Sequence, residues 1–192
     1  MTTGELLKVF NANEIRLLPE TIMSVLMGDI ENRDRIYRQL LHLNNYDLSY
    51  DWFQQIYEEE MSQRREMKQD FTPQVLGSIA SMICGDQQRS TYEPTAGNGS
   101  MLISDWHNKL SKCYPWEFFP SMNRIECWEL SDRSIPILLL NLSIRGIMGV
   151  VYHGDVLELK IKQKYILLNR HDDALAFSEI HKVENNAKII KI

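Results

Sequence analysis

The sequence is short of cysteine, and its three cysteines lie far apart. Cys84, Cys113 and Cys127 form no Cys-x-x-Cys pair, which is the spacing that zinc sites and redox motifs use. An odd and scattered set is equally unsuited to a disulfide framework. We therefore expect reduced thiols and no metal site.

Long apolar runs and an excess of positive charge are missing as well. No run approaches the roughly 18 residues that a membrane-spanning helix needs. The opening MTTGELLKVFNANE also lacks the basic start, apolar core and small-residue cleavage site of a secretory signal. These absences predict a cytoplasmic protein without membrane contact. The net charge of −5 argues against a free-standing nucleic-acid binder, because phosphate contacts need clustered cations, so DNA contact would depend on a partner.

The residues that are present have an ordinary globular composition, with 44% hydrophobic and 24% charged residues among 192. Helical spacing of apolar residues dominates the first third of the chain, in the segments GELLKVFNANEIRLLPETIMSVLMG, RDRIYRQLLHLNN and SYDWFQQIYEEEMSQRREMKQ. The pattern of apolar residues changes at FTP, where Thr72 can cap a helix that begins at Pro73. The sequence predicts an N-terminal helical segment over residues 1–66 and a second domain over residues 67–192.

Strand-like and helix-like runs alternate in the second domain. Short apolar strands are predicted at about residues 90–93, 124–129, 149–153 and 165–168, with helical patterns among them. Such alternation is typical of βαβ units, so we expect an α/β fold with a parallel sheet.

The stretch TYEPTAGNGSMLI places two glycines directly after the first predicted strand. Gly97 and Gly99 permit a tight turn and a close approach of backbone to ligand, and ligands bind α/β sheets at the carboxyl ends of the strands. Glu93, Glu129 and Asp155 end the first three predicted strands. Singly, each carboxylate is better explained as a helix cap or a solvated turn. Jointly they favour an adenosine ligand with a cationic tail, such as S-adenosylmethionine, over a dinucleotide, whose pyrophosphate prefers amide donors without flanking acids.

The ordered motifs FTP, YEPTAGNGSMLI, ECWELSD, NLSIRGI and HGDVLEL resemble those of adenine-N6 DNA methyltransferases. The likeness is greatest to the modification subunit of type I restriction systems, and it covers about residues 50–168, including the segment DWFQQIYEEEMSQ. The resemblance implies a Rossmann-like methyltransferase fold and S-adenosylmethionine as cofactor. It also implies a set of cofactor-binding residues: Phe71, Thr72, Glu93, Thr95, Gly97, Asn98, Gly99, Glu129 and Asp155. Glu93 stands where that family more often has Asp.

The family's catalytic motif, Asn/Asp-Pro-Pro-aromatic after the fourth strand, is incomplete here. In that motif the Asn or Asp side chain and a proline carbonyl accept hydrogen bonds from the target amino group, and the aromatic ring stacks on the flipped base. The segment KYILLN would deliver Asn169 to this place, but Arg170, His171 and Asp172 follow it, without proline or aromatic ring. The 23 residues after Asn169 are too few for the remaining strands and a target-reading region. The chain therefore resembles the cofactor-binding half of such an enzyme, with an incomplete sheet.

Two functions remain open on these grounds. The first is a DNA adenine-N6 methyltransferase of restriction-modification type, or its cofactor-binding subunit, completed by a protein partner or a second copy that makes the DNA contact. The alternative is a pseudoenzyme on the same degenerate fold, with a regulatory, decoy or interaction role. A NAD-type protein ranks below both, because Leu102 stands where a full Gly-x-Gly-x-x-Gly motif has its last glycine.

Overall fold

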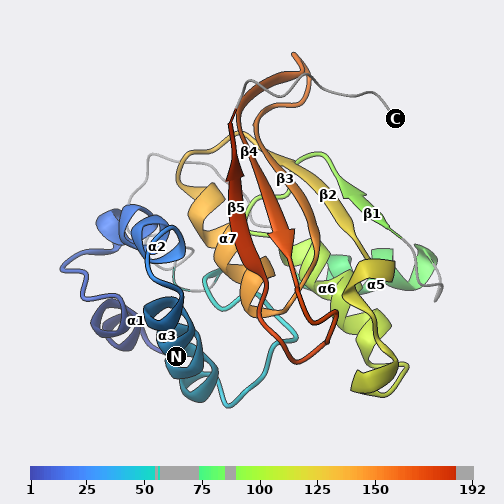
Figure 1. Cartoon of the computed structure of the whole chain (residues 1–192), viewed down its shortest axis with the longest axis horizontal. Coiled ribbons are helices and arrows are strands. Elements are labelled where there is room, and N and C mark those ends of the chain that lie inside the picture. The colour runs from blue at the N-terminus through green and yellow to red at the C-terminus, as the bar shows by residue number, and fades with distance from the viewer. Residues whose placement is uncertain (55, 57–73, 85–89, 185–192) are drawn as a thin grey trace.

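The computed structural model describes residues 1–54, 56, 74–84 and 90–184. The chain forms an α/β fold on one five-stranded mixed sheet (Figure 1). Phe71 and Thr72, both predicted to bind the cofactor, lie outside the described residues, as does most of the helix predicted over residues 49–69.

In residues 1–54 the N-terminal segment forms three α-helices and a short 3-10 helix: α1 (Thr3–Val9), η1 (Ile15–Leu17), α2 (Leu18–Leu26) and α3 (Ile30–Leu43). The helix pattern predicted over residues 4–28 is broken at Asn11, whose backbone has a φ of 50°. Side chains fix two of the helix starts, because the first backbone N–H groups of a helix have no partner within it. Thr2 and Glu5 form a reciprocal capping box at α1, and Asp29 Oδ2 accepts a hydrogen bond from Asn32 N at 2.8 Å.

The sheet has the strand order β1-β2-β3-β4-β5. Its strands are β1 (Thr91–Glu93), β2 (Ile125–Glu129), β3 (Gly149–Asp155), β4 (Lys160–Leu168) and β5 (Glu179–Val183). The first three strands are parallel, as the sequence predicted, and this order is that of one half of a doubly wound sheet.

The prediction of a parallel fourth strand is wrong, because β4 pairs antiparallel with β3 and β5 antiparallel with β4. Only residues 156–159 join β3 to β4, whereas a parallel crossover takes about a dozen residues or more. The chain can therefore only turn back as a hairpin. No described strand pairs with the outer side of β1, where a second parallel half would begin. The fold is thus α/β and compatible with an incomplete Rossmann-like sheet.

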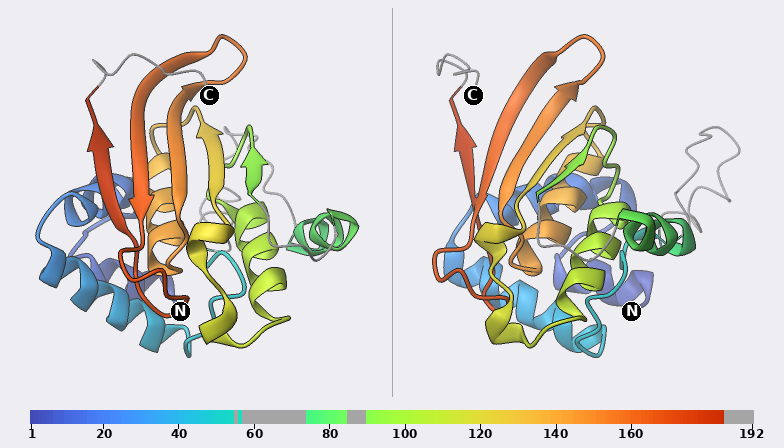
Figure 2. Two further views of the ribbon diagram at one scale, coloured as in Figure 1. Left: turned by 45° about the vertical axis from the view of Figure 1, so that its right-hand side comes forward. Right: turned by 90° about the vertical axis from the view of Figure 1, so that its right-hand side faces the viewer.

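Among the described residues after position 73 there are three more α-helices, α5 (Gln74–Cys84), α6 (Ser100–Leu110) and α7 (Ser134–Ile144), and two 3-10 helices, η2 (Pro115–Glu117) and η3 (Pro120–Met122). Figure 2 shows α6 and α7 on the same face of the sheet, whereas no α-helix of the described residues covers the other face. Side chains on the helix-covered face, such as Cys127, Val151 and Leu167, are almost completely buried.

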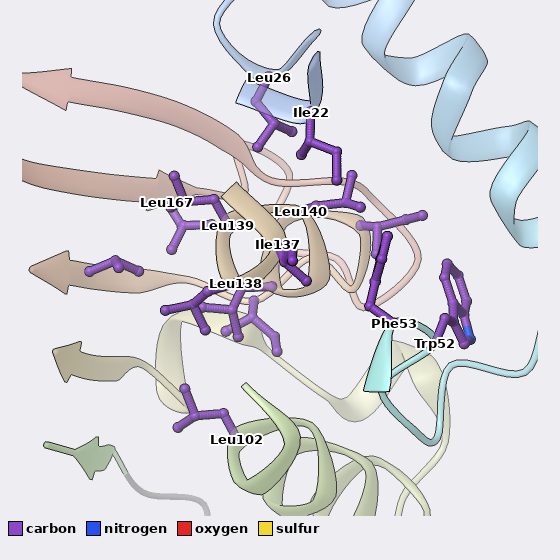
Figure 3. Close-up of a cluster of buried hydrophobic side chains, with 14 of the residues drawn as sticks. Ile22, Leu26, Trp52, Phe53, Leu102, Ile137, Leu138, Leu139, Leu140 and Leu167 are labelled. Carbon is purple, nitrogen blue, oxygen red and sulfur yellow. The ribbon is translucent and has the colours of Figure 1, made fainter. Parts of the chain in front are cut away.

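Helix α7 is the centre of the hydrophobic core. All of its residues from Ile135 to Ile144 are buried, which is the expected state of a helix that is apolar all round. Figure 3 shows that Ile22 and Leu26 of α2, and Phe53 of the segment after α3, lie around this helix together with side chains of the sheet such as Leu167. The N-terminal helices and the sheet therefore share one core, through α7.

Candidate functional site

The glycine loop, residues 94–99, connects the carboxyl end of β1 to the start of α6. Both glycines have left-handed backbone conformations, with φ of 55° at Gly97 and 92° at Gly99. Residues other than glycine rarely adopt these conformations. Their surroundings differ. A Cβ atom at Gly99 would lie 2.9 Å from Leu138 Cδ1 of α7, whereas one at Gly97 would meet nothing within 4 Å. Gly99 thus seats the loop on the core, and the space beside Gly97 is open.

Glu129 holds this loop from the neighbouring strand. Its Oε2 accepts a hydrogen bond from Gly97 N at 2.7 Å, and its Oε1 accepts one from Ser131 N, also at 2.7 Å. One carboxylate therefore joins the turn after β1 to the turn after β2. Each carboxylate oxygen can accept a second hydrogen bond, so Glu129 retains acceptor capacity for hydroxyl groups of a ligand.

Glu93 shares a sheet face with Glu129. Glu93 pairs with Cys127 in the register of β1 and β2, and Cys127 and Glu129 are two residues apart, so all three side chains lie on one face. Burial raises the pKa of the half-buried Glu93 carboxyl, although the Thr95 backbone N–H, which donates to it, acts in the opposite sense. Burial and the nearby carboxylates of Glu93, Glu129 and Glu126 also raise the pKa of the Cys127 thiol. The site is therefore acidic, and it disfavours added negative charge.

Asp155 lies apart from this pair. The register sets His153 opposite Glu129, so Asp155 is two residues farther along, roughly 7 Å beyond the end of β2. Its Oδ1 accepts hydrogen bonds from Leu157 N at 2.9 Å and Glu158 N at 3.1 Å. The carboxylate closes the hairpin turn between β3 and β4, and the structure does not bring it to the glycine loop.

The residue beside Glu129 on the neighbouring strand β3 is His153, its partner in the sheet register. This residue was not identified from the sequence. Its Nε2 lies 2.9 Å from Asp132 Oδ1, and Lys162 Nζ lies 3.0 Å from the same oxygen. Burial, followed by repulsion from Lys162, lowers the pKa of His153. The imidazole therefore lies beside the turn that follows β2, in contact with an acid of that turn.

A buried polar network supports the loop from behind. Asn98, predicted to bind cofactor, is buried, and its backbone oxygen accepts a hydrogen bond from Asn141 Nδ2 at 2.9 Å. The same Asn141 nitrogen donates to Asp51 Oδ1 at 2.9 Å. Asp51 lies in the segment that follows α3. The N-terminal part of the chain is therefore connected to the glycine loop through Asn141 of α7.

Arg145 completes this network beneath Asn141. Its guanidinium donates to Asn141 O at 2.8 Å, Leu48 O at 2.9 Å and Tyr50 O at 2.6 Å. Burial raises the pKa of Asp51 and lowers that of Arg145 to about 10, which still leaves the guanidinium charged at neutral pH. The signal that could have found the network is Asn141 itself, a polar residue inside the apolar run PILLLNLSI.

Asn169 lies at the end of the sheet where β3 begins, opposite the end that carries the glycine loop. Its predicted place beside the cofactor is therefore wrong. Because β4 is antiparallel, Leu167 pairs with Gly149 at the start of β3, about 20 Å from the end of that strand. Asn169 is buried there. Its Nδ2 donates to Asp173 O at 2.7 Å and Gly146 O at 3.1 Å, so it stabilises a turn.

Comparisons with known proteins do not identify the site. No protein-family model matches the chain, and no curated protein matches it. Within the described residues, no group of three or more His, Cys, Asp or Glu side chains could hold a metal ion. None of the helices described is long and apolar enough to cross a membrane.

Proposed function

We propose that this chain binds S-adenosylmethionine at the carboxyl ends of β1 and β2 and does not catalyse methyl transfer by itself. One observation carries the proposal: Glu93 and Glu129 share a sheet face at the edge where Gly97 leaves open space beside the loop. Spare acceptor capacity on Glu129 suits the two ribose hydroxyls of an adenosyl group. A half-buried carboxylate at Glu93 suits the ammonium group of the methionine part.

The charge of the site favours this ligand over the other adenosine-containing candidates. NAD and ATP carry phosphates, which two carboxylates beside the loop would repel. S-adenosylmethionine has no phosphate, and its sulfonium and ammonium groups are both attracted by acids. Leu102 in place of a third glycine also argues against a dinucleotide. The adenine amino group would need an acceptor other than Asp155, whose carboxylate closes the hairpin turn.

A role without independent catalysis follows from Asn169. Methyl transfer to adenine needs an acceptor for the target amino group beside the cofactor, and Asn169 lies at the far edge of the sheet. Under this proposal the chain is either the cofactor-binding subunit of an adenine-N6 DNA methyltransferase, completed by another chain, or a regulatory protein that uses the cofactor without reacting it.

Calorimetry with wild-type protein and two matched variants tests the proposal. Glu93→Gln keeps the shape of the side chain and removes its charge, so binding of S-adenosylmethionine should weaken by about tenfold or more, as expected for loss of a hydrogen-bonded ion pair. Glu126→Gln is the control, because Glu126 is exposed and lies on the other face of β2. NAD should not bind detectably. Absence of S-adenosylmethionine binding to the folded wild-type protein, or equal effects of the two variants, would overturn the proposal.

A second assay separates the two roles. Transfer of labelled methyl groups to adenine in DNA should be absent with the chain alone. If transfer appears on adding a partner chain, the subunit role holds. If the isolated chain methylates DNA, the non-catalytic part of the proposal is wrong, and the calorimetric result stands independently.

A further inference from the structure

A basic groove of about 590 Å³ runs between α1 and α3, on the N-terminal helices. Six polar or charged side chains line it: Lys8, Arg35, Arg38, Gln39, His42 and Tyr46. All six are exposed. This groove belongs to neither the glycine loop nor any motif of the sequence.

Three cations of the groove, Lys8, Arg35 and Arg38, form no ion pair with a carboxylate of the described residues. The guanidinium of Arg35 instead donates a hydrogen bond from Nη2 to the amide oxygen Asn32 Oδ1 at 2.6 Å. Several other basic side chains are paired with acids: Arg16 with Glu14, Arg33 with Asp34, Lys160 with Glu158 and Arg170 with Glu179. In a chain of net charge −5, three convergent unpaired cations create a local positive potential that attracts anions.

The helix dipole explains only part of this arrangement. Cations are stabilised in the last turn of a helix, which accounts for Lys8 in α1 and His42 in α3. Arg35 and Arg38 lie in the middle of α3, where the dipole gives no such benefit. Their spacing of three and then four residues up to His42 aligns the three side chains on one helix face.

The length of the row formed by Arg35, Arg38 and His42 indicates that the groove binds a polymeric anion. Arg35 and His42 are seven residues apart, which is about 10 Å along a helix. A nucleic-acid strand in B-form carries one phosphate per 3.4 Å or so of axis, so the row spans about three of the intervals between successive phosphates. One free phosphate would use only part of it.

An aromatic side chain at the end of the row distinguishes nucleic acid from an acidic peptide. Tyr46 is 67% exposed, and its ring lies edge-on to His42, with 6.5 Å between centroids. Its backbone is left-handed, with φ of 59°, and its N–H donates to Leu41 O at 2.8 Å, which fixes the residue just beyond α3. Exposed rings beside cations are the surfaces on which the bases of a single strand stack, and Asp or Glu side chains have no ring to stack.

We propose that the basic groove binds the backbone of single-stranded nucleic acid, with Lys8, Arg35 and Arg38 contacting phosphates and Tyr46 stacking on a base. Binding of this kind is independent of sequence and weakens with salt, because each phosphate contact releases condensed counterions. The proposal needs no cofactor and does not rest on the adenosyl site.

Fluorescence anisotropy with a labelled oligothymidylate, without S-adenosylmethionine, is the test. For the wild type we expect a Kd in the range of about 10⁻⁶ to 10⁻⁴ M and a slope of log K against log salt near −2, since each contact to a single strand contributes about −0.7. The double change Arg35→Ala/Arg38→Ala should bring the slope to about −0.7 and weaken binding by tenfold or so at low salt. Lys160→Ala, which removes one positive charge, is the control, because Lys160 lies in the distant β3–β4 hairpin, and it should leave Kd unchanged.

Two further measurements decide the identity of the ligand. Tyr46→Leu should weaken binding of the oligonucleotide without changing the salt slope, since it removes stacking and no charge. Poly-glutamate should compete poorly. The proposal is overturned by absence of binding at about 50 mM salt, by equal binding of wild type and the double variant, or by competition from poly-glutamate as strong as that from oligonucleotide. Circular dichroism of each variant checks that it is folded. Because cofactor is absent from this assay, its outcome and that of the calorimetry are separate.

Discussion

Replacing each loop glycine by alanine should have unequal consequences, although the two positions are two residues apart. At Gly99 alanine would hold a left-handed backbone with φ of 92°, which costs about 1–2 kcal/mol. Its Cβ would also lie 2.9 Å from Leu138 Cδ1, and such overpacking of a core costs about 1–3 kcal/mol. We expect Gly99→Ala to lower the free energy of unfolding by about 2–5 kcal/mol.

At Gly97 only the backbone cost applies. The φ of 55° lies in the left-handed region, and an added Cβ meets nothing within 4 Å, so Gly97→Ala should cost about 1 kcal/mol. The methyl group would however enter the open space beside the loop, so this variant should lose affinity for S-adenosylmethionine while remaining folded. Urea denaturation and calorimetry measure the two effects. Equal destabilisation of the two variants, or an undiminished affinity of Gly97→Ala, would refute the reasoning.

The remaining predictions concern the buried network and the acidic pair. Arg145→Met should lower the free energy of unfolding in urea by about 3–5 kcal/mol, because it leaves the carbonyl oxygens of Leu48, Tyr50 and Asn141 without their buried donor. Arg170→Met, which breaks an exposed pair, should cost less than about 1 kcal/mol, and a similar cost for both would contradict the network. For Glu93, whose pKa is raised in the folded state, the folded protein binds the proton more tightly than the unfolded chain. Its contribution to stability is therefore present at acid pH and declines as the pH rises from the unfolded pKa through the folded one. Glu93→Gln should remove that decline, so a pH titration of the unfolding free energy in which wild type and variant run parallel would show the prediction to be wrong.

Most of the glycine loop and of the parallel part of the sheet could be predicted from the sequence. The alternation of apolar runs placed β1, β2 and β3, and Gly97 and Gly99 marked a turn with left-handed backbone. Both signals are local, since they depend on the residues of one short segment. The same reasoning placed Glu93 and Glu129 at adjacent strand ends, and their common face followed once the register was known.

The direction of β4 was not predictable, because the apolar pattern of a strand is the same in either direction. The predicted strands also left residues 154–164 for the connection, whereas β4 begins at Lys160 and leaves only residues 156–159. That single reversal took Asn169 to the far edge and left Asp155 in a hairpin turn. Asn141 alone could have marked the buried network from the sequence. Its contact with Asp51 could not be predicted, because the two residues are 90 positions apart along the chain.

By itself, the sequence determined where helices, parallel strands and the flexible loop form, because hydrophobic period and backbone preference act over a few neighbouring residues. Only the tertiary structure decided which carboxylates meet, which polar side chains are buried together and which cations of α1 and α3 converge without acidic partners. These depend on distances between segments remote in sequence, which are set by how α7 packs between the sheet and the N-terminal helices.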